Sequence, residues 1–127
     1  MLYEKQASGT VDEVVARLEK AAANHKFGVL GIHDLKQKMN SKGLDFKPEC
    51  RILEVCNPGQ AKAVLETDIS ISNALPCRIS VYEAQGKITV SMLKPTDLLG
   101  LFGRPELDTV AQEVEEVMTR IIEEACK

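Results

Sequence analysis

The chain has 127 residues and a mass of 14.0 kDa, the size of one ordinary domain, so we predict a single domain over residues 1–127. Hydrophobic residues make up 44% of the sequence and charged residues 28%, a composition that excludes disordered, collagen-like and low-complexity chains. The 16 basic and 19 acidic side chains give a net charge of −3, which disfavours a protein that binds nucleic acid.

The first residues and the cysteine content of the sequence predict where in the cell the protein is located. Residues 1–6 lack the basic-then-apolar order of a secretory signal, and no apolar run approaches the roughly 18 residues of a membrane helix. The four cysteines include no C-x-x-C pair and are too sparse for a secreted disulfide scaffold. On one extended strand, Cys50 and Cys56 would lie roughly 20 Å apart, too far for a disulfide. We therefore expect a cytoplasmic protein with reduced thiols and no membrane partner.

Capping residues and hydrophobic periodicity predict the elements in the first half of the chain. Thr10 and Glu13 form a capping box at the start of a helix. Asp34 is a suitable N-cap for a short helix that Gly43 ends. The predicted elements are, in order, a strand over residues 2–8, a helix over 11–26, a strand over 27–32, a short helix over 34–39 and a strand over 49–56.

The second half of the chain contains the clearest hairpin. Two alternating runs, residues 77–82 and 87–92, flank a turn near residues 84–86. Asn57 and Pro58 mark the start of a helix before this hairpin. The other predictions are a connector over residues 68–75, a helical turn over 96–102, and a final helix that begins between Pro105 and Thr109, with a second capping box at Thr109 and Gln112.

This order of elements lacks the regular alternation of a parallel sheet. It predicts a two-layer α+β fold, in which helices cover one face of an antiparallel sheet. The other face is then free for solvent, a ligand or a second copy of the chain. We expect that face to mix polar and apolar residues and to form a homodimer; its predicted members are Leu53, Val55, Ser80, Tyr82 and Ser91.

Two segments resemble a known prokaryotic family. EVCNPG at residues 54–59 and LPCRISVYE at residues 75–83 are similar in wording and spacing to the family called domain of unknown function 302, and the resemblance extends from about residue 27 to 96. It implies a strand-helix-four-strand-helix arrangement similar to the TATA-binding-protein fold, in a compact, dimeric domain, without implying DNA binding. The family supplies no reaction and no catalytic residues.

Cys56 and Cys77 are the candidates for thiol chemistry. Cys56 ends a strand directly before a helix start, a placement that lowers the pKa of a thiol. Cys77 begins another strand, and if the two strands are neighbours the sulfurs can form a redox pair, a soft-metal site or a persulfide centre. This is our alternative function, a thiol-dependent redox or sulfur-handling protein. Free cysteine also commonly packs as a small apolar residue.

The same helix start suggests a ligand site. Backbone amides from Asn57 through Gly59 to Gln60 suit a carboxylate or phosphate, with Arg78 or Arg51 as the counter-charge. No phosphate-loop motif is present. The preferred function is a non-catalytic homodimeric domain that binds a small ligand, anionic or partly apolar, without cofactor or metal.

Two further groups have competing interpretations. His33 beside Asp34 suits a general base or a metal ligand, but the chain has only two histidines and no metal-ligand spacing. A structural role for His33 is therefore favoured.

An apolar cluster is expected to cover an edge of the core, or else to act as a lid or dimer contact; it consists of Leu98, Leu99, Leu101 and Phe102.

Overall fold

The structure, a computed structural model, describes residues 1–127 and contains one antiparallel sheet of order β1-β5-β4-β3-β2. Its strands are β1 (Leu2–Ala7), β2 (Gly28–Asp34), β3 (Cys50–Cys56), β4 (Cys77–Ala84) and β5 (Lys87–Leu93). The helices are α1 (Val11–Asn24), α2 (Leu35–Asn40), α3 (Pro58–Thr67), α4 (Pro95–Gly100) and α5 (Asp108–Ala125), with 3-10 helices η1 (Ile69–Ala74) and η2 (Pro105–Leu107). The predicted two-layer α+β fold is confirmed, with short helices added to the strand-helix-four-strand-helix order.

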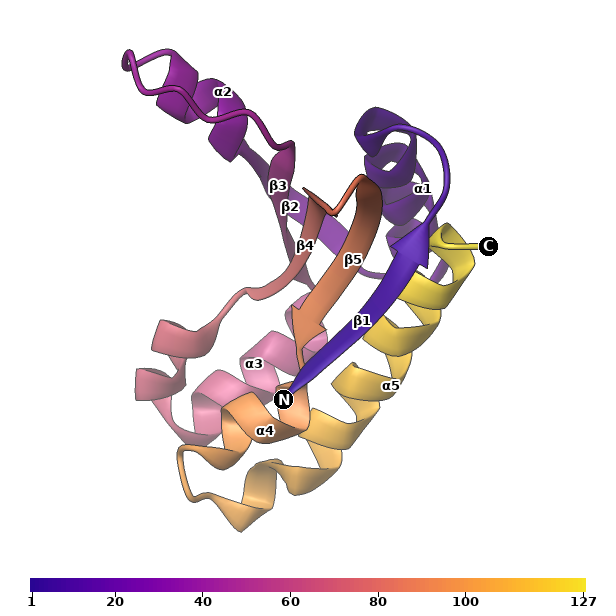
Figure 1. Cartoon of the computed structure of the whole chain (residues 1–127). Helices are drawn as coiled ribbons and strands as arrows, with labels where there is room; N and C mark the ends of the chain where they lie inside the picture. The colour runs from indigo at the N-terminus through magenta and orange to yellow at the C-terminus, as the bar shows by residue number, and fades with distance from the viewer.

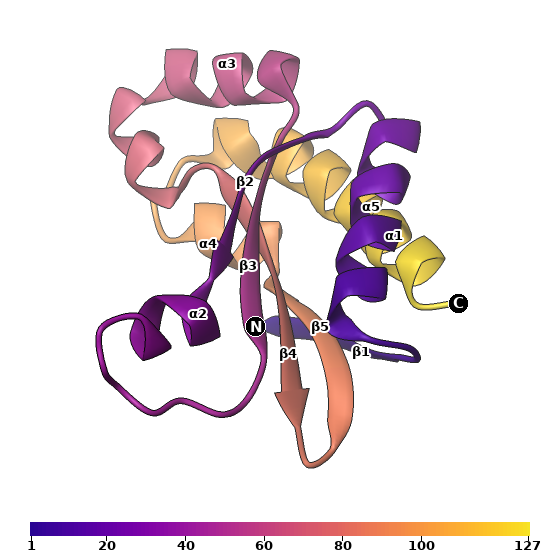
Figure 2. The same ribbon diagram turned by 90° about the horizontal axis from the view of Figure 1, so that it is seen from above.

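Two long helices cover one face of the sheet. Helices α1 and α5 lie side by side against it (Figures 1 and 2), and their apolar stripes form the main hydrophobic cluster with side chains of β3, β4 and β5. Leu53 and Val55 are fully buried in this cluster, so their predicted place on the free face is wrong. They are register partners of Ile79 and Cys77, and directly opposed residues point to the same side of a sheet.

The remaining face of the sheet, opposite α1 and α5, is called the open face below. Ile52, Ser80, Ser91 and Glu4 follow one another across it as register partners. Ser80 and Ser91 alternate with the buried Val81 and Val90, as the hairpin pattern predicts, although Ser91 is itself buried, with 5% of its surface exposed. The predicted polar members of the free face are therefore placed correctly.

Capping hydrogen bonds and a backbone angle explain where α1 begins and ends. The Thr10 hydroxyl accepts a hydrogen bond from the Glu13 amide at 3.1 Å, and the Glu13 carboxylate accepts one from the Thr10 amide at 3.0 Å, so the predicted capping box is confirmed. The helix ends at Asn24, earlier than predicted, because Lys26 adopts a left-handed φ of 64°.

The second predicted capping box is wrong. Helix α5 begins at Asp108, within the predicted window, but its N-cap is Leu107 and no side chain caps it. The 3-10 helix η2 leads directly into α5, so Thr109 already lies inside the helix.

The turn of the hairpin follows the standard two-residue form. Ala84 pairs with Lys87, and the two residues between them, Gln85 and Gly86, have positive φ values of 55° and 75°. Positive φ at both central positions is the type I′ geometry that matches the twist of paired strands. The predicted hairpin is confirmed.

Beyond one end of the sheet, a second hydrophobic cluster joins α3, η1, α4, η2 and α5. Ile71 is fully buried there, so the predicted connector over residues 68–75 is instead a structured element. Leu99 is buried and Phe102 packs against the cluster, whereas Leu101 is 76% exposed. We call this group the end cluster; its buried members are Val64, Ile71, Leu99, Leu107 and Ala111.

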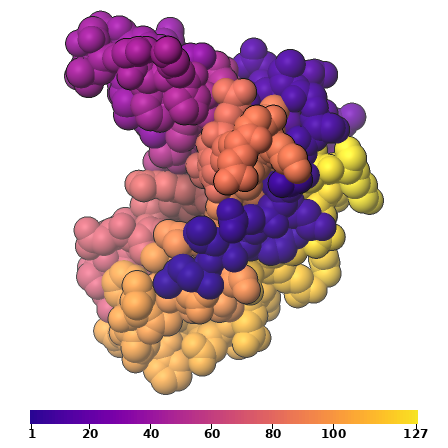
Figure 3. Space-filling view, viewed as in Figure 1, coloured from indigo at the N-terminus to yellow at the C-terminus, as the bar shows by residue number.

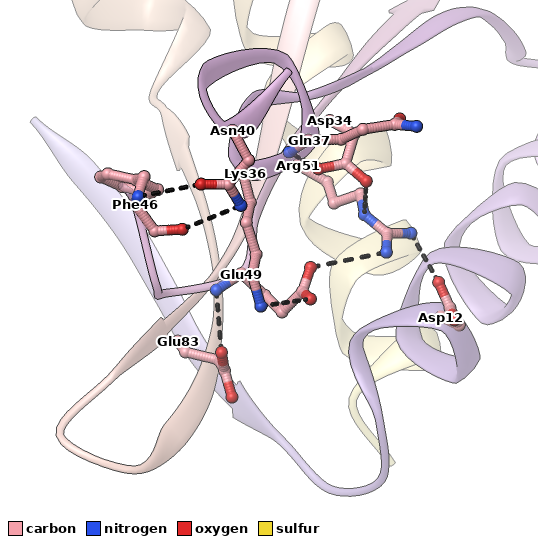
Figure 4. A network of polar contacts seen from close by, with 9 residues as sticks. All are labelled: Asp12, Asp34, Lys36, Gln37, Asn40, Phe46, Glu49, Arg51 and Glu83. Atoms are coloured by element: carbon pink, nitrogen blue, oxygen red, sulfur yellow. Dashed lines mark hydrogen bonds and ion pairs between the residues drawn. The ribbon is translucent and has the colours of Figure 1, made fainter. Parts of the chain in front are cut away.

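Helix α2 and the loop after it, residues 35–48, project from the sheet and are called the arm below. None of these residues is buried, and Figure 2 shows α2 on the side of the sheet away from α1 and α5. Arg51 holds the base of the arm through ion pairs with Asp12, Asp34 and Glu49 at 2.6, 3.3 and 3.5 Å (Figure 4).

None of the helices in the fold combines the length and hydropathy needed to cross a membrane.

Candidate functional site

A cavity of about 270 Å³ lies between the main hydrophobic cluster and the end cluster. Its wall is formed mainly by the last residues of β3, the first residues of β4, helix α3 and the segment that includes η1. Its polar lining is confined to Cys56, Asn57, Gln60, Ser72 and Cys77, and no charged side chain lines it. The apolar lining consists of Phe27, Val55, Ala61, Val64, Leu65, Leu75, Pro76, Leu99 and Val114.

Asn57 is the N-cap of α3 and lines this cavity. Its side-chain Oδ1 accepts a hydrogen bond from the Gln60 amide at 3.1 Å, and its Nδ2 donates to the Lys26 carbonyl at 3.4 Å. Pro58 at the first helical position has no amide hydrogen to offer. The helix cap therefore already uses one amide that the sequence assigns to an anion, and Gly59 does not line the cavity.

Gln60 is a cavity residue whose side chain lacks one hydrogen-bond partner. Its Oε1 is buried and has no hydrogen-bond partner, and the residue lines the cavity. A buried acceptor without a partner destabilises a protein, by roughly 1–3 kcal/mol in typical cases. Of the predicted binding residues, Asn57 and Gln60 line the cavity, whereas Gly59 and Arg78 do not.

Both candidate cysteines reach the same cavity. Strands β3 and β4 are neighbours, and Val55 is the register partner of Cys77, which brings the end of one strand to the start of the other. Burial raises the pKa of the Cys56 thiol, and burial together with the nearby Cys56 raises the pKa of Cys77 to about 11. The predicted lowering of the Cys56 pKa is wrong, because burial disfavours the charged thiolate and raises the pKa.

The predicted counter-charges lie elsewhere. Arg78 lines a groove of about 310 Å³ on the open face, called the open-face groove below, which shares Pro76 and Cys77 with the cavity. Arg51 lies near the other end of β3, where it is engaged by three carboxylates. The cavity is thus left without a cationic side chain.

His33 contacts a different carboxylate from its sequence neighbour. Its Nε2 lies 3.0 Å from Glu54 Oε1, whereas Asp34 caps α2 and pairs with Arg51. The carboxylate that contacts His33 is therefore that of Glu54 and not that of Asp34, its neighbour in the sequence. No group of three or more His, Cys, Asp or Glu side chains is placed to hold a metal ion.

The sequence reasoning missed the wall of the cavity that follows α3. Ser72 and Leu75 line it, but they belong to the stretch predicted to be a connector. Ile71 and Leu75 recur at helical spacing in that stretch, and this is the available signal for a packed segment.

Comparisons with known proteins identify the family of the chain and agree with its fold. The family model described as "Domain of unknown function DUF302" matches residues 3–125. The chain is 34% identical to a protein described as uncharacterized conserved protein DUF302 from Bacillus stearothermophilus, over 99% of this chain and 98% of that one, and its fold agrees with that crystal structure at a TM-score of 0.94. A search of curated proteins found no match. The resemblance carried by residues 54–59 and 75–83 is confirmed, and the chain belongs to the DUF302 family.

Proposed function

We propose that the protein is a non-catalytic domain that binds a small, neutral, largely apolar ligand in the cavity beside α3, and that it works as a homodimer. The observation that carries the ligand proposal is the largely apolar lining of the cavity, in which Gln60 is one of a few polar side chains and has an Oε1 without a partner in the chain. Ligand pockets are mostly apolar with a few placed polar groups, which is the composition found at this cavity.

The chemistry of the lining favours a neutral ligand over an anion. A carboxylate or phosphate moved into this cavity would lose its hydration without gaining a charged partner. Gln60 Oε1 accepts a hydrogen bond, so the ligand carries an N–H or O–H donor. The volume of about 270 Å³ lies just below the usual range of drug-sized pockets, roughly 300–1,000 Å³. A compact aromatic molecule with one donor, such as indole, is therefore the appropriate probe.

The test compares indole with 1-methylindole, which has the same ring but no N–H group. Titrations followed by NMR are expected to show tighter binding of indole, by about fivefold, the value of one modest hydrogen bond. Gln60→Leu should abolish this difference, because it removes the acceptor. Equal affinities of the two probes for the unsubstituted protein would contradict the assigned role of Gln60.

A matched pair of variants tests the cavity itself. Ala61 lines the cavity, and Ala63 lies exposed on the same helix. Ala61→Leu should therefore abolish indole binding, while Ala63→Leu should leave it unchanged. Binding that survives Ala61→Leu would place the ligand elsewhere and overturn the proposal.

The homodimer part of the proposal is supported by the open face. Leu2 and Leu93 are register partners there and are 50% and 47% exposed. They line the open-face groove together with Ile52 and Leu98. A contiguous apolar surface of this kind is typical of a contact with another protein surface.

Thiol chemistry is the alternative function, and one observation favours it: Cys56 and Cys77 line one cavity. The raised pKa of both thiols counts against a nucleophilic role, because the thiolate is the reactive form. The alkylation experiment described in the Discussion decides between the two functions.

A further inference from the structure

Arg78 differs from the other arginines of the chain in having no partner. Two backbone carbonyls accept hydrogen bonds from Arg17, and carboxylates pair with Arg51, Arg104 and Arg120. Arg78 is exposed on β4, and none of the ion pairs or side-chain hydrogen bonds of the chain involves it. Its guanidinium group is therefore free to bind an anion from outside the chain.

Two carboxylates near the open-face groove have other partners. Glu54 is the register partner of Arg78, but its Oε1 lies 3.0 Å from the Nε2 of His33. Asp97, on α4, lies 3.4 Å from the amino group of Met1. Neither carboxylate forms an ion pair with Arg78, so the positive charge of Arg78 lacks a direct counter-ion.

The open-face groove combines this one cation with an apolar surface. Arg78 is the only charged side chain among the lining residues, and the groove has a volume of about 310 Å³. Ile52 and Ser80, register partners in the middle of the sheet, lie on the same face as Arg78, because residues two positions apart on a strand point to the same side. In Figure 3 a recess separates the arm from the region of η1. The apolar lining of the groove includes Leu2, Leu93, Pro95 and Leu98.

We propose that the open-face groove binds a small amphipathic monocarboxylate, with its carboxylate paired to Arg78 and its apolar part on the surface around Leu93 and Leu98. A guanidinium group fits a carboxylate through two parallel N–H···O hydrogen bonds. A single cation matches one negative charge, whereas a phosphate dianion would leave a charge uncompensated beside apolar side chains. The inference goes beyond the proposed function, because it assigns a ligand to a second site and depends on neither the cavity ligand nor the homodimer.

A comparison of hexanoate with hexanamide tests the role of charge. The two molecules have the same length and shape, and only hexanoate is charged at neutral pH. In titrations followed by NMR, hexanoate should bind about fivefold more tightly, the upper range for an ion pair at an exposed site, and Arg78→Gln should abolish the difference. The matched control, Arg120→Gln, changes an exposed arginine on α5 and should preserve it. Equal affinities of hexanoate and hexanamide for the unsubstituted protein would overturn the inference.

Acetate tests the apolar part of the site. It carries the same charge as hexanoate but lacks most of the alkyl chain, so it should bind at least about tenfold more weakly. Raised salt should weaken hexanoate binding, because an exposed ion pair is screened. Acetate that binds as tightly as hexanoate would identify Arg78 as a surface cation without an apolar subsite, and this result would also overturn the inference.

Two substitutions on the open face test the location of the site. Ser80 and Thr89 both lie half-buried on this face, but only Ser80 lines the groove. Ser80→Phe should therefore abolish hexanoate binding, whereas Thr89→Phe should leave it unchanged. Ala61→Leu, which obstructs the cavity beside α3, should also leave it unchanged, so the indole and hexanoate titrations test separate sites. Hexanoate binding that survives Ser80→Phe, or NMR shift changes of the unsubstituted protein that centre outside the groove, would overturn the inference.

Discussion

At the scale of single residues, burial decides the chemistry of the cavity. Cys56 lies directly before a helix start, but burial disfavours its thiolate and raises the pKa of the thiol. Cys77 is affected more strongly, with a pKa of about 11. Gln60 lies at the same cavity with a buried oxygen that no group of the chain satisfies. The raised pKa of both thiols counts against a nucleophilic role, and the proposed function is binding.

Alkylation of the cysteines tests this at the residue scale. At pH 8, Cys77 is expected to react with iodoacetamide about 100-fold more slowly than an unperturbed thiol, because a rise of two pKa units lowers the thiolate fraction by that factor. Cys56 should also react more slowly than an unperturbed thiol. Mass spectrometry of partially modified protein measures each rate, and the unfolded chain in guanidinium provides the reference. Reaction of Cys56 faster than that reference would favour the thiol-dependent function.

At the scale of elements, hydrogen bonds within a few residues explain where helices begin. The capping box at Thr10 satisfies two amides at the start of α1, and Asn57 satisfies one at the start of α3. Helix α5 begins without such a cap because η2 leads directly into it. Two threonines with similar sequence contexts therefore have different structural roles.

Thr10→Ala and Thr109→Ala form a matched pair that tests this difference. Loss of the Thr10 cap should lower the free energy of unfolding by about 1 kcal/mol, whereas Thr109→Ala should be neutral or slightly stabilising, because alanine has the higher helix propensity. Urea denaturation with circular dichroism measures both. Equal effects of the two substitutions would contradict the assigned caps.

The capping box also predicts a pH dependence. Hydrogen bonds from the Thr10 backbone and side chain lower the pKa of Glu13 from its usual value of 4.5. Because the pKa is lower in the folded state, the stabilisation is complete above the unfolded pKa and is lost as the pH falls through the folded one. The stability difference between the unsubstituted protein and Glu13→Ala should thus be constant above about pH 5.5 and shrink in more acidic solution. A difference that grows on acidification would exclude this role for Glu13.

At the scale of the whole molecule, two hydrophobic clusters meet at the candidate site. The main cluster joins α1 and α5 to the sheet, and the end cluster joins α3, η1, α4 and η2 to α5. The cavity is lined from both sides, by Val55 and Val114 of the first and by Val64 and Leu99 of the second. Packing of the end cluster therefore contributes to the shape of the cavity.

Ile71→Ala and Ile69→Ala test the contribution of the end cluster. Ile71 is fully buried and Ile69 is 73% exposed, although both lie in η1. Removing the Ile71 side chain should cost about 2–5 kcal/mol of unfolding free energy, and removing that of Ile69 should change it by less than about 0.5 kcal/mol. Urea denaturation measures both values. A small effect at Ile71 would show that the end cluster contributes little to the fold.

The sequence by itself determined the features that depend on neighbours along the chain. The capping box at Thr10, the Asn57 cap and the hairpin with its Gln85-Gly86 turn were all predictable, because their hydrogen bonds and backbone angles involve residues a few positions apart. The alternation of β4 and β5 also identified their buried faces, since one side of each strand is distinctly polar. The family resemblance then extended these local features to the order of elements.

Only the tertiary structure decided which face of β3 is buried, because both faces of that strand carry apolar side chains and the choice depends on its register with β4. The same holds for the partners of Arg51, which come from α1, from β2 and from the residue directly before β3. It also holds for the cavity, which exists only where the two clusters meet. The raised pKa of Cys56 and Cys77 belongs here as well, since desolvation is a property of the surroundings and not of sequence position. Contacts between residues far apart in the chain carry no local pattern, and they are the contacts that build the candidate site.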